Sequence, residues 1–212
     1  MTLTKRNIKA LSFAVFSALF IFGCSTLNKV VNTISDFDKI QFKLGNVQNF
    51  ALCNVQISNI KSISDVSITD GLKLTQAFAS KSFPTNFTLE LVAHNPNKKS
   101  NNNNKSFDAI IKSIDWILLL DDKETINGRV SSPITIPTAS QNTIIPISIG
   151  LDLYKFFGEK GYNDIVNLAF ALGGVNGSAA RVKLKLKPEV SIAGIRIPYN
   201  AYITAIDKEF RS

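Results

Sequence analysis

Apolar residues recur at every second position along most of this 212-residue chain, from about Phe37 to the C-terminus. Successive side chains of a β-strand point to opposite faces of the sheet, so each such run predicts a strand with one buried face. Several short strands separated by turn residues predict an antiparallel β-sandwich rather than βαβ units. We expect about seven strands, namely Ile40–Leu44, Cys53–Ile57, Phe87–Ala93, Ile114–Leu120, Ile145–Leu153, Val182–Leu186 and Tyr199–Ala205.

Two segments break the period of two and predict short helices. In "TDGLKLTQAFAS", Thr69 or Asp70 is the expected N-cap, and apolar residues follow four positions apart. In "NDIVNLAFALGG", Asn163 is the expected N-cap and Gly173 is expected just past the C-terminal end of the helix. The fold class expected is therefore mainly β, with one or two short helices.

Turn residues mark several expected strand ends. Gly45-Asn46 closes the first run, Asp121 to Glu124 reads as a charged hairpin loop, and Asn127-Gly128 supplies residues that tolerate positive φ. The polar stretch 100–106 is expected to be a solvated loop.

The N-terminus has the arrangement of a secretory signal. Met1–Lys9 is basic, and Ala10–Gly23 is apolar without a charge. Spanning a bilayer as a helix takes roughly 20 apolar residues, so this run is short for an anchor and suits a signal peptide. Ile21, Gly23 and Cys24 resemble the bacterial lipobox, in which the cysteine thiol receives a diacylglycerol and the peptide is cut before it. The alternative is an uncleaved signal anchor in which the cysteine is incidental.

These features predict three parts: a lipoprotein signal peptide at 1–23, a lipidated N-terminus and tether at 24–37, and a β-sandwich domain at 38–212. The membrane, bound through the lipid on Cys24, is the expected partner. In diderm bacteria an Asp after the cysteine tends to retain lipoproteins in the inner membrane. Ser25 stands at that position here, which favours the outer membrane, facing the periplasm.

Composition excludes several classes of protein. With 45% hydrophobic and 19% charged residues the chain is expected to fold and to bury a core. The net charge is +8, of which Lys5, Arg6 and Lys9 contribute three; the +5 of a chain that starts at Cys24 is mild and spread along the sequence without a dense basic stripe, so we expect no nucleic-acid partner. Two cysteines and one histidine are too few for a structural zinc site, and we expect no metal and no cofactor.

"TLELVAHNPNKKS" and the segment "SIDWILLLDDKETINGRVSSPITIPTASQNTIIPISIGLDL" resemble the late embryogenesis abundant type 2 family, also called the water-stress and hypersensitive-response domain. The resemblance implies an immunoglobulin- or fibronectin-like sandwich with a helix at one side. It also implies a non-enzymatic module associated with membranes or stress protection. The family features fall on Asn95, Pro96, Asn97, Gly128, Pro137 and Ser140 and on Ile144 to Ile149.

The residues of Asn95-Pro96-Asn97 by themselves predict a structural role. Pro96 fixes its own φ and holds Asn95 extended, while the flanking amides bond neighbouring backbone. Ligand binding by these amides is the alternative.

Other reactive residues lack the partners that chemistry requires. His94 lies on the polar face of its strand, without a nucleophile nearby in sequence, and Cys53 reads as a small buried hydrophobe. "GGVNGS" lacks the Lys-Ser/Thr of a phosphate-binding loop. Asp121, Asp122 and Glu124 offer too few oxygen ligands for a calcium loop.

Lys183, Lys185 and Lys187 form a basic row on one strand. They would keep a sheet edge from aggregating or, alternatively, meet lipid phosphates.

Three functions of different class remain. The leading one is a non-enzymatic envelope lipoprotein whose sandwich binds or protects partners. The second is an accessory subunit of an envelope transport or assembly complex with an unknown protein partner, and the third is an enzyme with a dispersed site. The oligomeric state is not predicted.

Overall fold

A computed structural model describes residues 37–58, 60, 63–97, 107–138, 142–173 and 182–205. The predicted signal peptide, Cys24 and the tether lie outside the described residues, as do Ser140, the loop at 100–106 and most of "GGVNGS". Residues from Lys39 onward form one compact unit, and the architecture below is that of this unit.

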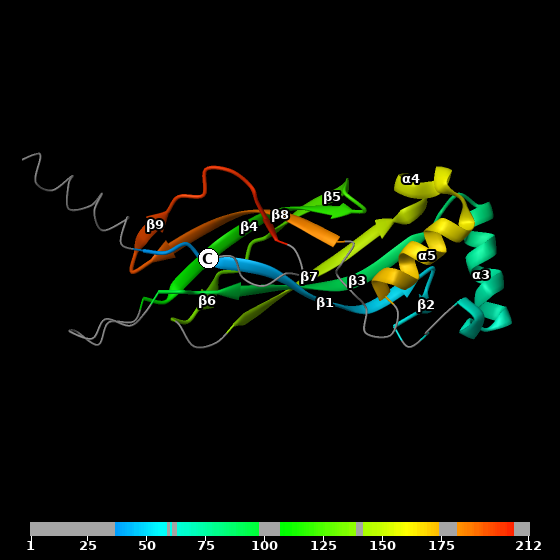
Figure 1. The fold of residues 1–212 in the computed structure, drawn as a ribbon, viewed down its shortest axis with the longest axis horizontal. Coiled ribbons are helices and arrows are strands. Elements are labelled where there is room, and N and C mark those ends of the chain that lie inside the picture. Colours follow the sequence, from blue (N-terminus) through cyan, green and yellow to red (C-terminus); the bar gives the residue numbers. More distant parts are fainter. Residues whose placement is uncertain are drawn as a thin grey trace, which may run out of the picture. The chain divides into compact units, whose positions relative to one another are not determined.

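Two antiparallel sheets build the domain (Figure 1). One sheet, called sheet A, has the order β2-β1-β3-β7, with bounds Val55–Gln56, Gln41–Leu52, Pro84–His94 and Thr143–Asp152. The other, called sheet B, has the order β10-β8-β4-β5, with bounds Ile203–Ala205, Val182–Ile192, Ala109–Leu120 and Lys123–Val130. Two short strands complete sheet B: β6 (Ile134–Ile136) pairs with β4, and β9 (Ile195–Ile197) pairs with β8.

The core is made by the alternating residues that the sequence pattern singled out. Leu89 and Leu91 of β3, Leu118 of β4, Ile147 of β7 and Leu184 of β8 are at most 3% exposed. Apolar inner faces of two sheets give the packed centre of a sandwich. The prediction of a mainly β fold with an antiparallel sandwich is therefore confirmed.

Three α-helices and two 3-10 turns gather at one end of the sandwich, near β2 and the end of β7 (Figure 1). Aromatic rings of Phe78, Phe83, Tyr154 and Tyr162 contact one another edge to face and so join these elements. The elements are η1 (Ile63–Asp65), α3 (Ile68–Ala79), α4 (Leu153–Phe157), η2 (Gly158–Lys160) and α5 (Tyr162–Gly173).

Both predicted helices are present, but their ends differ from the predictions. The N-cap of α3 is Ser67, whose Oγ accepts from the Asp70 N–H at 3.1 Å, rather than Thr69 or Asp70. Asn163 lies inside α5, and Gly173 is its last residue. A Cβ on Gly173 would lie 2.2 Å from Cγ of Phe50, so a glycine lets α5 approach β1 closely.

Two turn predictions and one strand prediction are wrong. Gly45-Asn46 does not end β1, which continues to Leu52 across two irregularities of register. Asn127-Gly128 lies within β5, paired with β4. Cys53 with Asn54 forms the two-residue turn between β1 and β2, both at positive φ, so Cys53 is not on a strand. The charged hairpin prediction is confirmed at Asp121 and Asp122, which also have positive φ.

Lys185, the middle residue of the lysine row, does not lie at a sheet edge. Its strand, β8, runs between β4 and β10, and Leu184 to Leu186 pair on both sides. At Lys185 the interpretation of an edge is therefore wrong.

Candidate functional site

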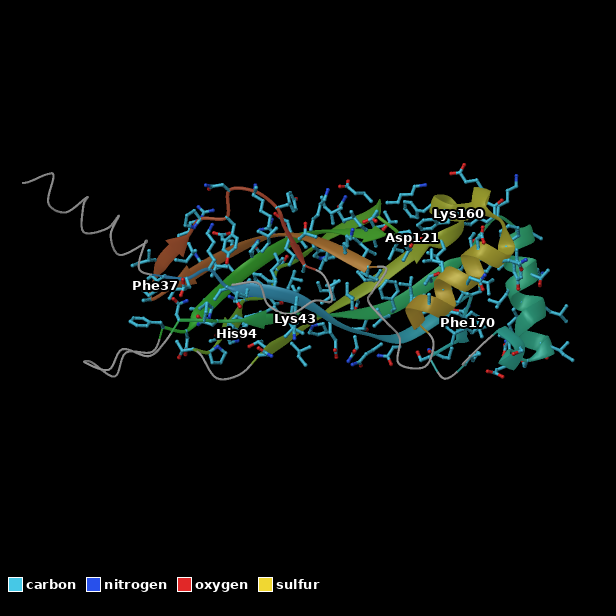
Figure 2. The ribbon with its side chains drawn as sticks, in the orientation of Figure 1. Phe37, Lys43, His94, Asp121, Lys160 and Phe170 are labelled. Atoms are coloured by element: carbon cyan, nitrogen blue, oxygen red, sulfur yellow. The ribbon has the colours of Figure 1, made fainter. Side chains whose placement is uncertain are left out.

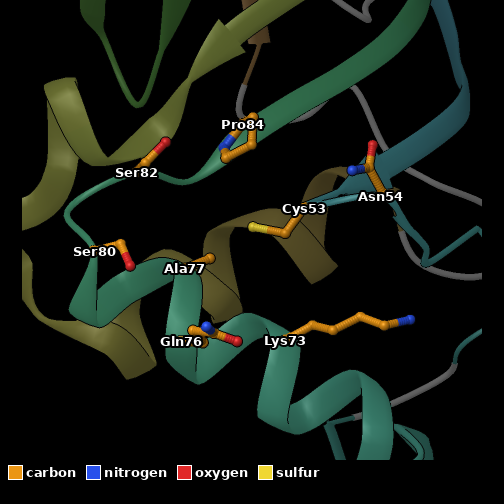
Figure 3. Close-up of a pocket in the computed structure, with 8 residues that line it drawn as sticks. All are labelled: Cys53, Asn54, Lys73, Gln76, Ala77, Ser80, Ser82 and Pro84. Carbon is orange, nitrogen blue, oxygen red and sulfur yellow. The ribbon is translucent and has the colours of Figure 1, made fainter.

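A pocket with a volume of about 310 Å³ lies where the β1–β2 turn faces helix α3. Figure 3 shows the Cys53 thiol extending from this turn over the helix, with Lys73 directed away from it. Polar and apolar atoms contribute about equally to its lining. The lining residues are Cys53, Asn54, Lys73, Gln76, Ala77, Ser80, Ser82 and Pro84.

Local hydrogen bonds hold both walls of the pocket. The Cys53 N–H donates to the Pro84 carbonyl at 2.8 Å, which fixes the turn against the start of β3. On the helix side, the Ser80 N–H donates to the Gln76 carbonyl at 2.9 Å, which caps the end of α3. The pocket is therefore formed by a turn, a helix end and a strand start.

Asp152 anchors the strand that borders the pocket. Its carboxylate accepts from the Phe83 N–H at 2.7 Å, from the Tyr154 N–H at 2.9 Å and from the Ser82 hydroxyl at 3.2 Å. This carboxylate caps α4 and at the same time ties the end of β7 to the start of β3.

Partial burial, together with the negative charge of Asp152, raises the pKa of the Cys53 thiol to about 11. Reactive cysteines owe their nucleophilicity to a lowered pKa, since the thiolate is the attacking form. Cys53 is therefore a neutral thiol at neutral pH, and the pocket offers hydrogen bonds rather than a nucleophile.

Asn95 is wholly buried and joins the two sheets. Its Nδ2 donates to the carbonyls of Phe107 and Ile136 at 3.0 and 3.1 Å, and its Oδ1 accepts from the backbone N–H of Asn97 at 3.1 Å. The side chain of Asn97 also donates to this oxygen at 2.9 Å. These contacts tie the end of β3 to residues before β4 and at the end of β6, which is consistent with a structural role of the motif.

Gly128 and Pro137 likewise have structural positions. Gly128 faces Trp116 across the β4–β5 pair, and a Cβ there would lie 2.3 Å from Cζ2 of the indole. The glycine is needed to accommodate this ring and not to form a turn. Pro137 is exposed and follows β6, beside Thr138, whose N–H donates to Asp108 at 2.9 Å.

His94 and Asp121, both singled out from the sequence, have protein partners. His94 Nδ1 lies 3.2 Å from Oδ1 of Asn142. Asp121 pairs with Lys160 at 3.6 Å, and both are labelled in Figure 2.

The acidic hairpin and the lysine row are brought together. Lys183 pairs with Asp122 and Lys185 pairs with Glu124. From the sequence, the acidic residues are a possible cation site and the lysines are a possible contact with lipid phosphates. In the structure the two groups form ion pairs with each other. In the part of the chain that the structure describes, no group of three or more His, Cys, Asp or Glu side chains could hold a metal ion.

A second surface feature lies on the outer face of α3. Ile68 is 87% exposed and Leu72, one turn later, is 66% exposed, whereas only Leu74 of this helix is buried. Residues four apart lie on one face of a helix, so these two side chains form one apolar patch, which we call the α3 patch.

Sequence reasoning found the structural motif but missed the pocket and the α3 patch. "CN" between two apolar runs is a turn signal, since Asn tolerates positive φ, and it was the available sign of the β1–β2 turn. The pocket residues Lys73, Gln76, Ser80 and Ser82 carry no sequence pattern that links them to that turn.

Comparisons with known proteins give one weak similarity in sequence. No family model matches the chain. Over 114 residues it is 32% identical to the polyisoprenyl-teichoic acid–peptidoglycan teichoic acid transferase TagU of Bacillus cereus and of Bacillus anthracis. The match covers 52% of this chain and 35% of the transferase, so the chain spans about a third of the length of the curated relatives it matches.

The prediction that the chain is not an enzyme is corrected by this comparison, because the matched relatives are named as transferases. Among solved structures, a crystal structure of a protein from Archaeoglobus fulgidus is similar with a TM-score of 0.32 and 11% identity, over 82% of this chain and 92% of that one. None of the helices among the described residues has the length and apolar character needed to cross a bilayer.

Proposed function

We propose that the chain is a bacterial envelope lipoprotein, anchored through Cys24, whose β-sandwich is a binding module held near the membrane. The observation that carries this proposal is Cys24 itself, which follows Ile21 and Gly23 at the end of an uncharged apolar run behind a basic head. One acyl chain anchors a protein only marginally, so an N-terminus with two or more chains is what holds the domain at the surface.

The distribution of charge supports a position beside a membrane. Over the described residues, basic and acidic side chains are equal in number, and a chain cut before Cys24 loses Lys5, Arg6 and Lys9, so its surplus of +5 falls wholly in the remaining segments. Those segments include residues 98–106, which hold three lysines and no acid. Basic segments attract anionic lipid head groups, by about 1 kcal/mol for each residue near the surface.

The test of the anchor is Cys24→Ser, with Cys53→Ser as the matched control. Cys24→Ser is expected to abolish labelling with a fatty-acid probe and to leave the larger, uncleaved precursor. Cys53→Ser is expected to label and to be cut as in the wild type. Label that survives Cys24→Ser would show that the lipid is attached elsewhere, and normal cleavage of that variant would indicate an ordinary secreted protein.

A stress-protective role of the module is the leading form of this proposal. It is supported by the order of motif residues at Asn95, Gly128 and Pro137, which resembles the water-stress family. A folded module would protect clients through a surface, so protection of a dried client enzyme should be lost when the module is unfolded beforehand. Equal protection by the unfolded chain would contradict this.

A second candidate is an accessory subunit of an envelope transport or assembly complex, and the α3 patch favours it. Exposed apolar side chains grouped on one helix face mark contact sites for partners. The matched relatives are named for transfer of teichoic acid to peptidoglycan, so machinery that assembles envelope polymers is a natural source of the partner.

Copurification from mildly solubilised membranes tests this candidate. Leu72→Lys is expected to release a stoichiometric partner, because it places a charge in the apolar contact. Thr69→Lys, an exposed position on the same helix outside the α3 patch, is the control. A partner retained by Leu72→Lys, or none in the wild type, would exclude the α3 patch as the contact.

A further inference from the structure

Strand β7 forms an end of sheet A, and among the described residues only β3 pairs with it. Its ladder with β3 runs from Thr143 to Asp152 without any shift of register. From Thr143 to Leu151 it carries no charged side chain. A long, regular and uncharged edge is a template for pairing with another chain, and most proteins avoid one.

The other long strands with a free side are protected. The outer strand of sheet B, β5, has a shift of register against β4 and carries exposed Lys123, Glu124 and Arg129. Strand β1 has two shifts of register, a residue at positive φ (Asn49), and α5 packed against it. β7 therefore differs from both in keeping its edge regular and uncharged.

Pro146 shows which backbone groups point outward. A proline inside a sheet is confined to edge strands, with its missing N–H on the solvent side. Backbone groups alternate sides along a strand, so Ser148 and Gly150 present their N–H and C=O groups to the same open edge. The residues at these three positions are exposed, whereas Ile145, Ile147, Ile149 and Leu151 face the core.

We propose that this edge is a self-association site, at which β7 of one copy pairs antiparallel with β7 of a second copy about a two-fold axis at Ser148. This register places Ser148 opposite its own counterpart, and Pro146 opposite Gly150. The bulky ring then meets a residue without a side chain, and the Gly150 N–H reaches the Pro146 carbonyl.

A second copy fits this edge better than an arbitrary chain because the strand is complementary to itself. In the same register Ile147 lies opposite Ile149, and Ile145 lies opposite Leu151, so the apolar inner face continues across the pair. When two identical strands pair, any charged side chains on them lie near like charges, which disfavours pairing. From Thr143 to Leu151, β7 has no charged side chain, so no such repulsion arises. Pairing joins two copies of sheet A into one continuous sheet.

The mass of the full-length protein in mild detergent, measured by light scattering, tests the proposal. The wild type is expected to be a dimer. Ser148→Lys places two like charges opposite each other and is expected to halve the protein mass. Asn127→Lys, which adds the same charge at an exposed position on β5, is the control and is expected to remain dimeric. A monomeric wild type, or a dimer that survives Ser148→Lys, overturns the proposal.

Cross-linking gives a second readout that does not depend on a destabilised variant. A hydrogen-bonded antiparallel pair holds its Cα atoms about 5.5 Å apart, within the range that a disulfide spans. In a Cys53→Ser background, Ser148→Cys is expected to form a disulfide-linked dimer under mild oxidation, whereas Asn127→Cys is not. Equal cross-linking of the two variants, or none at position 148, overturns the register.

Discussion

At the scale of the residue, Asn95 shows how one side chain can hold two sheets together. Both amide hydrogens of Nδ2 reach carbonyls of the sheet B side, at Phe107 and Ile136, while Oδ1 accepts from Asn97. A buried amide is tolerated only when its hydrogen bonds are made. The same contacts that satisfy it therefore close the end of the sandwich.

Asn95→Ala is expected to lower the free energy of unfolding by about 1–3 kcal/mol or more, because it leaves buried carbonyls without donors. Chemical denaturation measures the change, and Asn127→Ala, on an exposed strand position, should shift the midpoint little. If Asn95→Ala were as stable as the wild type, the junction would have no energetic role.

Cys53 supplies a pH-dependent prediction. Burial and Asp152 raise its pKa to about 11 from the ordinary 9.0, so the folded state holds the thiol proton more tightly than the unfolded state does. This stabilisation is present below pH 9 and is lost as the pH rises from about 9 to about 11. Alkylation by iodoacetamide should therefore stay slow at pH 8 and rise with a midpoint near 11 in the folded protein. A midpoint near 9 would show that the thiol is not shielded.

At the scale of the element, the sequence predicts where strands and helices are but not how their ends are shaped. Alternation identifies β3, β4, β7 and β8 because burial of one face depends on local order alone. Asn127-Gly128 has the composition of a turn, yet it is strand, since Trp116 on the neighbouring strand needs the space above Gly128. That requirement is tertiary and leaves no local pattern.

Substitution of two glycines by alanine distinguishes a glycine that is needed for close packing from one that only lowers the stability of a helix. Gly128→Ala drives a Cβ to within 2.3 Å of the Trp116 ring, and is expected to destabilise the protein by about 1–3 kcal/mol. Gly71→Ala, in α3 with nothing within 4 Å of the new Cβ, is expected to stabilise it by about 1 kcal/mol. Thermal or chemical denaturation of both variants measures the difference. The same sign for both changes would contradict these two roles.

At the scale of the whole molecule, burial is uneven between the sandwich and its helical end. Strands β3 and β4 bury side chains along most of their length, whereas α3 buries Leu74 alone. The candidate pocket lies between these regions, at the β1–β2 turn and α3, and it depends on three segments that meet only in the folded state. For that reason the sequence pattern indicated the β-sandwich and the Asn95 motif but not the pocket.

This imbalance predicts that α3 opens without global unfolding. Local opening costs the least free energy where few apolar side chains are buried. Ile68 and Leu72 are exposed, so they contribute no hydrophobic burial that would hold the helix in place. Amide hydrogen exchange of the isolated protein should therefore be faster in α3 than in β3 and β4, even though Ser67 caps the helix. If a partner covers the α3 patch, the same amides should become protected in membranes that contain it, while β3 and β4 remain unchanged. If the amides of α3 exchange as slowly as those of β3 in the isolated protein, the helix unfolds together with the core. Local opening of α3 would then have no role in partner binding.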